Sequence, residues 1–372
     1  MADPQLLRLG WLRRRYLTQR PTEVATTVAT SAQPSADWDA FVRARPAANL
    51  YQLSGWALLA REVFGHAAYF IECRDSSGAL AGVLPLVRQK SVLFGSSLTS
   101  IPFFNYGGAL ADTPEVTQAL MEHARSLAQS LTCRYVEFRD VGRQPGEWRV
   151  RTDKVTLVLD LPADFATLSK QLGAKLRSQA KRADRESPSV RVGGAELLND
   201  FYSIFCRTMR DLGTPVYPRR FFAAILERFR EECLLVIVDR AGQPAAAAFL
   251  VIANGRAEIP WAACRDDAKP AGFNMRLYWE VLRVVVERGC RQFDFGRSTA
   301  DSGTYRFKLQ WGAKPLQLHW HRWEPGGRTG DDAPSSPASE GKLMHYATEV
   351  WKRLPLGLAN ALGPLVSPSL PW

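Results

Sequence analysis

The sequence predicts an α/β protein with mixed sheets in which one structural unit occurs twice. The chain is long enough for two domains, because 372 residues with 46% apolar side chains can fill two cores. A strand–turn–strand pattern occurs at 69–87 and again at 234–252. In both halves a helical pattern then leads into a similar strand, Cys133–Phe138 or Cys290–Phe295. The copies are offset by about 160 residues, the length of a domain rather than of a short repeat.

Residues 1–36 carry basic side chains but no segment that could form a core. Five arginines occur in the first 20 residues, without the apolar run and small-residue cleavage site of a secretory signal. Thr22–Ser35 is a polar stretch. We therefore expect 1–36 to be a flexible basic arm, with the ordered body starting near Asp37.

The first predicted unit, 37–160, consists of alternating helix and strand patterns. The spacing of apolar residues predicts a helix over Ser54–Phe64 and another over Val116–Leu131. Between these helices, the turn Asp75–Gly78 separates two apolar segments that we assign as paired strands. Arg134–Phe138 is predicted as a strand, the last element of the pattern that the two halves share.

A basic helix is predicted between the units, in the segment 161–189. Apolar residues recur at helical spacing from Phe165 to Ala183, and Pro188 ends the pattern. Basic side chains flank this apolar stripe and suit phosphates along a groove, although a solvated charged face has the same pattern. The net charge of +11 favours the anion-binding interpretation. The cations that we assign to phosphate binding are Lys175, Arg177, Lys181 and Arg182.

The second predicted unit, 190–323, repeats the order of the first. The turn Asp239–Gly242 joins two strand patterns, and a helix over Asn274–Arg288 leads into another strand. The remaining segment, 324–372, begins as a linker rich in Gly, Pro, Ser and Asp. It ends in an apolar tail that Pro355 interrupts.

Composition and motifs exclude several classes of protein. The longest apolar run is too short for a bilayer span, which needs about 20 residues. The six cysteines include no C-x-x-C pair, which favours reduced thiols in a cytoplasmic protein over disulfides. Phosphate-binding loops, dinucleotide fingerprints, serine-hydrolase elbows and zinc-protease motifs are absent. His319 and His321 share one face of a predicted strand, but no third ligand is near, so we expect no metal site.

The densest group of chemically useful residues lies in the segment 293–312. A predicted strand carries Asp294, and Gly296 allows the chain to turn at the end of that strand. Arg297 and Ser298 then open a loop. Ligands of open α/β sheets bind beyond the carboxyl ends of strands, so this loop is a candidate binding site.

A lysine among aromatic residues follows in the same segment. Lys308 comes shortly after Tyr305 and Phe307, and an ammonium beside aromatic rings can hold an anionic group in a partly dry cleft. The alternative is structural. In it, Asp294 and Arg297 form a local ion pair and the lysine is solvated.

Four segments of the chain resemble the Fem-type (FemAB/FemX) aminoacyltransferases. They are Asn-Tyr-Gly-Gly at Asn105–Gly108, the basic helix Leu172–Val192, Asp-Phe-Gly-Arg-Ser at Asp294–Ser298, and the Phe-Lys and Trp-Gly pairs within Tyr305–Gly312. The likeness covers 37–323 and is closest to the FemAB-like proteins associated with PEP-CTERM/exosortase systems of Gram-negative bacteria. The paired C-terminal motifs are its most specific part.

The resemblance implies two tandem GNAT-like domains and the transfer of an acyl or aminoacyl group to an amine, with no cofactor. In that family the donor is aminoacyl-tRNA and the acceptor is an amine of a peptidoglycan precursor, so the expected setting is envelope or exopolysaccharide assembly. Two departures leave the donor open between aminoacyl-tRNA, acyl-CoA and acyl-carrier protein. Phe165–Glu186 has no room for the helical hairpin of some Fem proteins, and the loop motif that grips acyl-CoA pyrophosphate is missing.

The chemistry of amide formation, together with the resemblance, assigns roles to residues. The catalyst must hold the reactants together and neutralise a developing oxyanion, without a covalent nucleophile. We expect Lys308 to hold the oxyanion or a donor phosphate, and Asp294 to accept an amine proton or to fix Arg297. The basic helix would hold the phosphates of the donor. The expected substrate contacts are Asn105, Tyr106, Gly107, Gly108, Arg297, Ser298, Tyr305 and Phe307.

Two other functions fit the sequence. One is an acyl-CoA-dependent N-acyltransferase. The other is a non-catalytic module that docks on anionic membrane or on a protein complex through the basic arm and the apolar tail, at the cytoplasmic face of the inner membrane. Because Pro355 interrupts the tail, packing of the tail on the protein's own core is an equal alternative.

Overall fold

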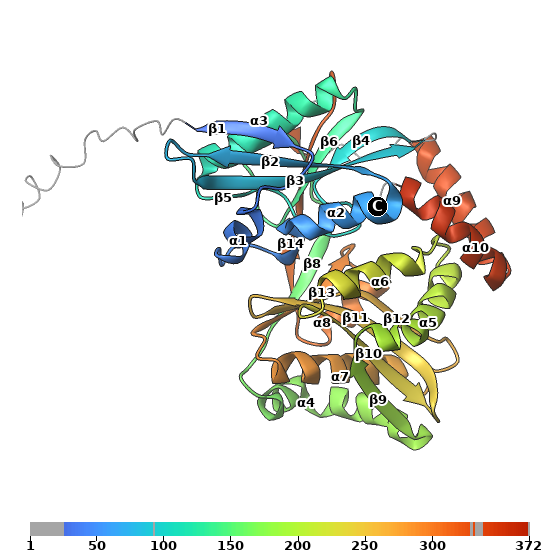
Figure 1. Ribbon diagram of the computed structural model, residues 1–372. Helices are drawn as coiled ribbons and strands as arrows, with labels where there is room; N and C mark the ends of the chain where they lie inside the picture. The colour runs from blue at the N-terminus through green and yellow to red at the C-terminus, as the bar shows by residue number, and fades with distance from the viewer. Residues whose placement is uncertain (1–25, 92–93, 328–329, 332–337, 371–372) are drawn as a thin grey trace, which may run out of the picture.

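Two sheets, one above the other, form the body of the protein (Figure 1). The computed structural model describes residues 26–91, 94–327, 330–331 and 338–370. Both sheets combine parallel and antiparallel pairs and carry helices. The predicted α/β class with mixed sheets is therefore confirmed.

The first sheet contains nine strands within the described residues, and helix α3 covers one of its faces. In order across the sheet they are β1 (Thr27–Ser31), β2 (Ala67–Arg74), β3 (Leu80–Ser91), β4 (Gly95–Thr99), β6 (Tyr135–Asp140), β15 (His319–Trp323), β7 (Arg149–Arg151) and β16 (Gly330–Asp331), with β5 (Leu110–Ala111) paired to β3. The helices of this part are α1 (Trp38–Arg43), the 3-10 turn η2 (Leu50–Gln52), α2 (Ser54–Phe64) and α3 (Pro114–Ser130). The hydroxyl of Thr113 accepts the Val116 N–H and so fixes the start of α3.

The second sheet contains seven strands of the described chain. In order they are β14 (Lys314–Gln317), β8 (Val155–Asp160), β13 (Gln292–Ser298), β12 (Arg256–Cys264), β11 (Gln243–Ala253), β10 (Cys233–Arg240) and β9 (Pro188–Gly193). Its helices are α4 (Phe165–Lys181), η3 (Arg182–Glu186), η4 (Ala195–Leu197), α5 (Leu198–Asp211), α6 (Arg219–Arg228), α7 (Phe273–Glu287) and α8 (Gly303–Leu309). The chain ends in α9 (Ala338–Lys352), α10 (Leu356–Val366) and η5 (Ser367–Ser369).

The same arrangement occurs in both sheets, as the repeated sequence pattern predicts. An antiparallel pair, β2–β3 or β10–β11, is followed by two parallel strands joined through a helix. In the first sheet α3 connects β4 to β6, and in the second α7 connects β12 to β13. The predicted helices and hairpins lie where the apolar periodicity placed them.

The two units exchange strands at their boundary. β8 falls inside the predicted first unit, 37–160, yet it pairs with β13 of the second sheet. β15 falls inside the predicted second unit, 190–323, yet it pairs with β6 of the first sheet. Each parallel strand pair leaves an open edge, and an antiparallel strand from the other unit closes that edge. The sheets are therefore tied together by the backbone in both directions.

The segment predicted as a connecting helix, 161–189, packs as part of the second unit. Leu168, Leu176 and Ala183 are buried in the core between the second sheet and α7. The helix is not continuous, because Gly173 has a φ of 79° and kinks α4, and η3 forms its last turn. The apolar stripe thus faces a core and the basic residues lie outside it.

One apolar core runs through both units. It joins Trp38 and Trp56 of the first unit to Phe222 and Trp261 of the second. Trp56, for example, stacks on Phe229 with ring centroids 4.4 Å apart. Burial of such large aromatic surfaces stabilises the contact between the units strongly. The sheets are therefore held in a fixed relation, and a site between them has a rigid frame.

The ends of the chain differ from the sequence-based expectation. Ordered structure begins before Asp37, because Thr27–Ser31 forms β1 on the edge of the first sheet. Its β-branched residues suit an edge strand, although the segment was expected to belong to the arm 1–36. Residues 1–25 lie outside the described part of the chain. At the other end, the tail forms two helices that separate at Pro355.

Candidate functional site

Two carboxylic acids meet where the second sheet faces the first unit. Glu258 on β12 and Asp294 on β13 are direct neighbours in the parallel register of these strands. Ile259 and Phe293, next to them in the chain, point into the core on the α7 side. Because side chains alternate along a strand, both carboxyls face the first unit. Both are buried, and we refer to them as the carboxyl pair.

Donors from the first unit converge on the carboxyl pair. Tyr51 Oη donates to Glu258 Oε2 at 2.5 Å, and Asn105 Nδ2 donates to Glu258 Oε1 at 3.1 Å. Tyr106 Oη lies 2.8 Å from Asp294 Oδ2 and 3.2 Å from Glu258 Oε2. Tyr106 therefore bridges the two acids. Of the sequence-predicted residues, Asn105, Tyr106 and Asp294 are brought together here.

Asp294 accepts two further hydrogen bonds from its own sheet. The Thr156 hydroxyl on β8 and the Gly296 N–H, the latter at 2.7 Å, both donate to Asp294 Oδ1. Burial raises the pKa of Asp294, while these donors oppose the rise. Burial and the nearby charge of Asp294 raise the pKa of Glu258 to about 8. The burial of two adjacent acids therefore favours one proton shared by the pair near neutral pH.

The predicted Asn-Tyr-Gly-Gly segment forms the loop that carries two of these donors. The N–H groups of Gly107 and Gly108 both donate to the Arg139 carbonyl at 3.0 Å, which fixes the loop on β6. A Cβ at Gly108 would lie 2.1 Å from Asp140 Oδ1, so no side chain fits at this position. The two glycines thus hold the loop in place, and Asn105 and Tyr106 reach the carboxyl pair.

A cavity of about 390 Å³ opens over the carboxyl pair. Tyr51 and Tyr106 line it beside Glu258 and Asp294, and the other lining side chains are mainly apolar. A concave, largely apolar space with a few convergent polar groups is typical of a small-molecule site. Arg256 also lines this cavity, but the carboxyl pair lies at the base, where its negative charge favours the amine group of a ligand.

A second cavity, of about 580 Å³, lies where the end of β13 meets the first sheet. It is polar and strongly basic. Its cations are Arg134, Arg139, Arg151, Lys154, Arg297 and Arg322, and among the described lining residues Glu137 is the carboxylate. We refer to this space as the arginine cavity.

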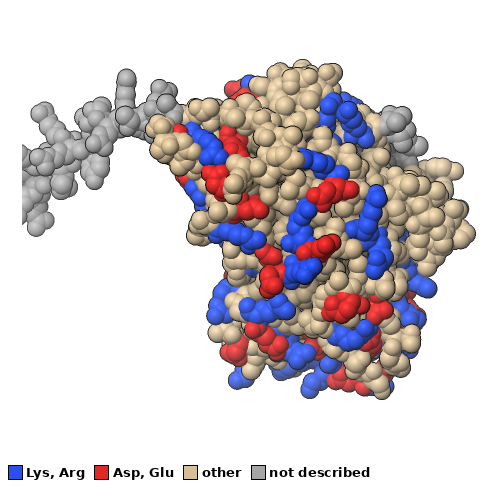
Figure 2. Space-filling view, in the orientation of Figure 1, with Lys and Arg blue, Asp and Glu red and all other residues tan. Residues whose placement is uncertain are grey.

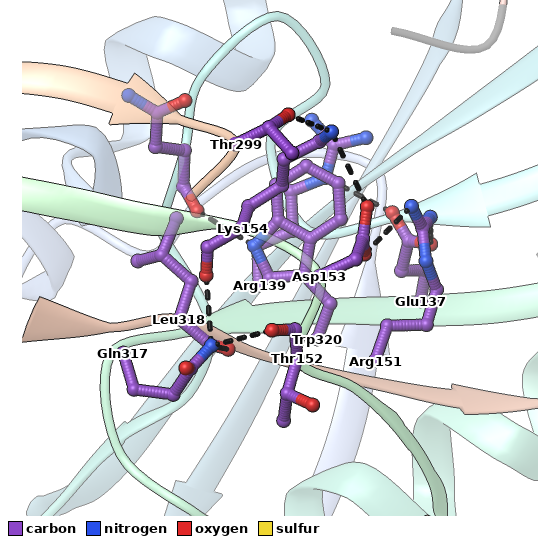
Figure 3. A network of polar contacts seen from close by, with 11 residues as sticks. Glu137, Arg139, Arg151, Thr152, Asp153, Lys154, Thr299, Gln317, Leu318 and Trp320 are labelled. Atoms are coloured by element: carbon purple, nitrogen blue, oxygen red, sulfur yellow. Dashed lines mark hydrogen bonds and ion pairs between the residues drawn. The ribbon is translucent and has the colours of Figure 1, made fainter. Parts of the chain in front are cut away.

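The cations of this cavity outnumber the carboxylates that pair with them in the described chain. Asp153 pairs with Arg151 and Lys154, Glu324 pairs with Arg322, and Glu137 is the third carboxylate. Arg139 Nε lies 3.0 Å from Glu137 Oε1, and Arg151 Nη1 lies 3.6 Å from Glu137 Oε2. Burial would raise the pKa of Glu137, but the charges of Arg139, Arg151 and Arg322 lower it further and keep the carboxylate ionised. Figure 3 shows Glu137, Arg139 and Arg151 beside Asp153 and Lys154. The cavity keeps a net positive charge and therefore suits an anion.

The end of β13 adds two groups to the arginine cavity. The Arg297 guanidinium lies 5.5 Å from the ring centroid of Trp320, and no hydrogen bond or ion pair joins it to another residue in the described chain. The Ser298 hydroxyl is buried and has no hydrogen-bond partner there either. Burial and the charge of Arg139 lower the pKa of Arg297. A bound anion would satisfy both groups.

Trp320 and Asn105 connect the two cavities. Trp320 Nε1 donates to the Asn105 carbonyl at 3.0 Å, and the side chain of the same asparagine donates to Glu258. β13 also serves both spaces, since it presents Asp294 to one and Arg297 to the other. A ligand in either cavity therefore lies against the same short strand and loop.

Lys308 is buried under the bend of β13. Its ammonium donates to the carbonyls of Gly296 at 2.8 Å and Arg297 at 2.9 Å, and it lines neither of the two cavities. Burial lowers its pKa to about 8, against the opposing charges of Asp294 and Glu258. The structural alternative of a solvated lysine is therefore wrong. Lys308 holds the backbone at the place where β13 passes from the carboxyl pair to the arginine cavity.

Other sequence-predicted residues lie away from both cavities. Tyr305 and Phe307 pack against the second core, and Phe307 contacts Tyr278 with ring centroids 4.9 Å apart. The basic side chains of α4 lie on the opposite face of the second sheet, where α4 packs on α7. They are Lys175, Arg177, Lys181 and Arg182.

Sequence reasoning missed Glu258, Tyr51 and the arginines of the first sheet. Glu258 lies between Ala257 and Ile259 on an otherwise apolar strand, and an acid in that setting is the signal that could have indicated it. Tyr51 offers no local signal, since its partner is far away in the chain.

Two general searches complete the description of the site. Among the described residues, no group of three or more His, Cys, Asp or Glu side chains is placed to hold a metal ion. Across the same residues, no helix is both long and apolar enough to cross a membrane.

Comparison with known proteins defines the fold. A family model described as an acetyltransferase (GNAT) domain matches residues 170–309, which run from α4 to the end of α8. A tandem GNAT protein from the clavulanic acid biosynthesis pathway superposes with a TM-score of 0.53 at 13% identity, over 84% of this chain and all of the other. The fold is a tandem GNAT fold. The GNAT match also confirms the prediction of a transferase enzyme.

Two further structures share the tandem GNAT fold. FemX superposes with a TM-score of 0.61 at 15% identity, over 78% of this chain and 96% of that protein. The C-terminal domain of a putative lysylphosphatidylglycerol synthetase from Agrobacterium fabrum gives 0.51 at 13% identity, over 79% and 91% of the two chains. At this identity the likeness is one of fold. A search of curated proteins finds no match to the sequence.

Proposed function

We propose that the protein is a Fem-type acyl- or aminoacyltransferase that forms an amide in cell-envelope biosynthesis. The observation that carries the proposal is the pairing of two unlike cavities on one strand. Asp294 of β13 belongs to a buried carboxyl pair, and Arg297 of the same strand lines a cavity rich in cations. Amide formation between an amine and an anionic, activated substrate needs both environments close together.

The carboxyl pair suits the amine substrate. An amine arrives as an ammonium ion, and the single negative charge of the pair attracts it into a largely apolar space. The amine must lose a proton before it can attack. Asp294, with a raised pKa, can accept that proton, and Tyr106 connects it to Glu258.

The reaction then follows the ordinary course of acyl transfer. The neutral amine nitrogen attacks the carbonyl carbon of an ester or thioester donor, and a C–N bond forms. The C–O or C–S bond of the donor breaks when the oxyanion collapses. The proton first taken from the ammonium is released to water. The attacking nitrogen then loses a second proton, which the carboxyl pair passes to the departing oxygen or sulfur, so the pair returns to its starting state.

The arginine cavity suits an anionic part of a substrate. Arg297 and the Ser298 hydroxyl have no competing partners in the described chain, and the cavity has an excess of positive charge. Phosphates and carboxylates of a peptidoglycan or exopolysaccharide precursor have the matching chemistry. The envelope setting, including exopolysaccharide assembly in PEP-CTERM/exosortase systems and a location at the cytoplasmic side of the inner membrane, follows from the motif resemblance.

The proposal allows two roles for Lys308. Its ammonium uses two protons on backbone carbonyls, and a third remains for an oxyanion or a donor phosphate. Its other effect is to fix Asp294 and Arg297 relative to each other. Lys308→Met removes both effects, and amide formation that continues unchanged in this variant would eliminate the lysine from the mechanism.

The donor is proposed to be aminoacyl-tRNA, with acyl-CoA as the second candidate because the family model is that of an acetyltransferase domain. The basic end of α4 supports a phosphate-bearing donor. Arg182 packs beside Gly272, which precedes the first turn of α7, so cations and a helix N-terminus lie together. Lys175, Arg177 and Lys181 extend this basic surface along α4.

A donor screen tests the proposal. The purified protein is incubated with pools of aminoacyl-tRNA, acyl-CoA or acyl-carrier protein and a set of amine acceptors, and mass spectrometry detects a new amide. We expect one donor class to give product with the wild type and with Asp160→Asn, an exposed acid on β8. Asp294→Asn should give none. Product from Asp294→Asn at the wild-type rate would refute the role of the carboxyl pair.

A further inference from the structure

The last helix of the chain packs with its small residues inward. Ala359 and Gly363 of α10 are buried against the body of the protein, and a Cβ at Gly363 would lie 2.8 Å from the Val216 nitrogen. The larger leucines of α10 therefore point away from the core. This is the reverse of an ordinary surface helix, in which bulky apolar residues face inward.

The outward face of α10 is a continuous apolar surface. Leu358, Leu362 and Leu365 are exposed at helical spacing, and Leu365 keeps 74% of its side chain in solvent. No residue of Leu356–Val366 is charged. Figure 2 shows that the surface over α9 and α10, on the right, is almost free of charged side chains. A patch of this kind marks an interaction surface.

Cations lie at the end of α9 that leads into this apolar face. Lys352 and Arg353 are exposed there, just before α10, and Lys352 also pairs with Glu349 at 2.6 Å. Apolar residues beside basic ones match the acyl layer and the anionic headgroups of a membrane surface.

We propose that α10 docks the protein on an anionic lipid surface, with Leu358, Leu362 and Leu365 inserted at the level of the headgroups. The occupant is argued from this chemistry: exposed leucines with no charge among them suit the acyl layer, and Lys352 and Arg353 beside them suit anionic headgroups. The helix lies along the surface and does not cross it, because it has 11 residues.

Docking in this way would bring the arginine cavity to the lipid headgroups. The tail beyond α10 is tied to the first unit, since His66 Nε2 lies 3.1 Å from the Pro368 carbonyl. Ser369 and Leu370 then form part of the rim of the arginine cavity. Resting on the proposed function, this arrangement places the anion-binding rim of the arginine cavity at the level of the headgroups.

Vesicle flotation of the full-length chain tests the docking surface independently of any reaction. Vesicles of phosphatidylcholine with one quarter phosphatidylglycerol are compared with vesicles of phosphatidylcholine alone. We expect the wild type to float with the anionic vesicles. The triple variant Leu358→Ser, Leu362→Ser and Leu365→Ser should lose about 10³-fold in binding, since each leucine contributes about tenfold. Val192→Ser, an exposed apolar residue on β9, serves as the matched control and should float like the wild type.

Several outcomes would overturn the docking proposal. They are absence of wild-type binding, equal binding to neutral and anionic vesicles, and unchanged binding of the triple variant. A dimer that the triple substitution dissociates, seen by analytical ultracentrifugation, would replace the lipid by a second copy as the occupant. Because flotation needs no donor or acceptor, its failure is distinct from failure of the donor screen.

Discussion

The two copies of the unit place an acid at the same position and surround it in opposite ways. Aligning Cys133–Phe138 with Cys290–Phe295 matches Glu137 to Asp294. Each acid forms the last residue pair with the neighbouring parallel strand. Its partner is Thr99 in the first copy and Glu258 in the second. The acid of the first copy thus faces a hydroxyl, and that of the second faces another acid.

The residue two places further on decides the charge around each acid. In the first copy Arg139 follows and pairs with Glu137 at 3.0 Å. In the second copy Gly296 follows, and only its N–H reaches Asp294. One acid therefore keeps a lowered pKa and anchors cations, while the other has a raised pKa and can exchange a proton. Under the proposed function, the same position therefore supplies a structural acid in the first copy and a proton-accepting, chemical acid in the second.

Replacing the chemical acid should have the largest effect. Asp294→Asn keeps the shape of the side chain but removes its charge and its ability to take a proton. We expect kcat for amide formation, with the donor found by the screen, to fall by about 10²–10⁴-fold. The urea midpoint should stay near that of the wild type, because an amide oxygen can still accept the Thr156 and Gly296 hydrogen bonds. A comparable loss of stability would make Asp294 a structural acid like Glu137.

The pH dependence of stability should have opposite signs for the two copies. The folded-state pKa of Glu258, about 8, lies above its unfolded value of 4.5, so the folded carboxyl keeps a proton that the unfolded one has released. Its contribution is complete below pH 4.5 and is lost as the pH rises through 8. Glu137, with a lowered pKa, loses its contribution as the pH falls.

Urea unfolding between pH 5 and 9 measures this difference. Glu258→Gln should remove the decline on the alkaline side that the wild type shows, and Glu137→Gln should leave that decline in place. Parallel curves for wild type and Glu258→Gln would mean that the glutamic acid is already ionised at neutral pH.

The comparison also shows how far the sequence could predict this molecule. Apolar periodicity and turn residues were sufficient for the helices, the hairpins and the duplication, because these depend on neighbouring residues. The sequence motifs were sufficient to predict Asn105, Tyr106 and Asp294 as residues of the candidate site. Glu258 was missed, since its donors Tyr51 and Asn105 are distant in the chain. The strand exchange of β8 was missed because the order of strands along a chain does not fix which sheet each one joins.

Breaking the structural acid's ion pair should have a smaller effect on stability, and it also removes one cation from the arginine cavity. Arg139→Met leaves Glu137 buried with the more distant Arg151 and should cost about 3 kcal/mol of unfolding free energy. The second substitution Glu137→Gln, made in the same chain, should recover most of this loss because no buried charge remains unpaired. Urea denaturation of the two single variants and the double variant measures the coupling. Additive losses would show that the two side chains do not act as a pair.

The smallest effect on turnover should come from the basic residues of α4. Within the described chain, only the second copy has such a basic helix on the outer face of its sheet. The variant Lys175→Gln, Lys181→Gln, Arg182→Gln leaves both cavities intact, so turnover of a small donor should change less than twofold. If the donor is aminoacyl-tRNA and each cation contacts a phosphate, the slope of log KM against log salt should fall by about 2, since each contact contributes about 0.7 for a single strand. An unchanged slope would mean that these cations form a solvated face and that the phosphates of the donor bind in the arginine cavity instead.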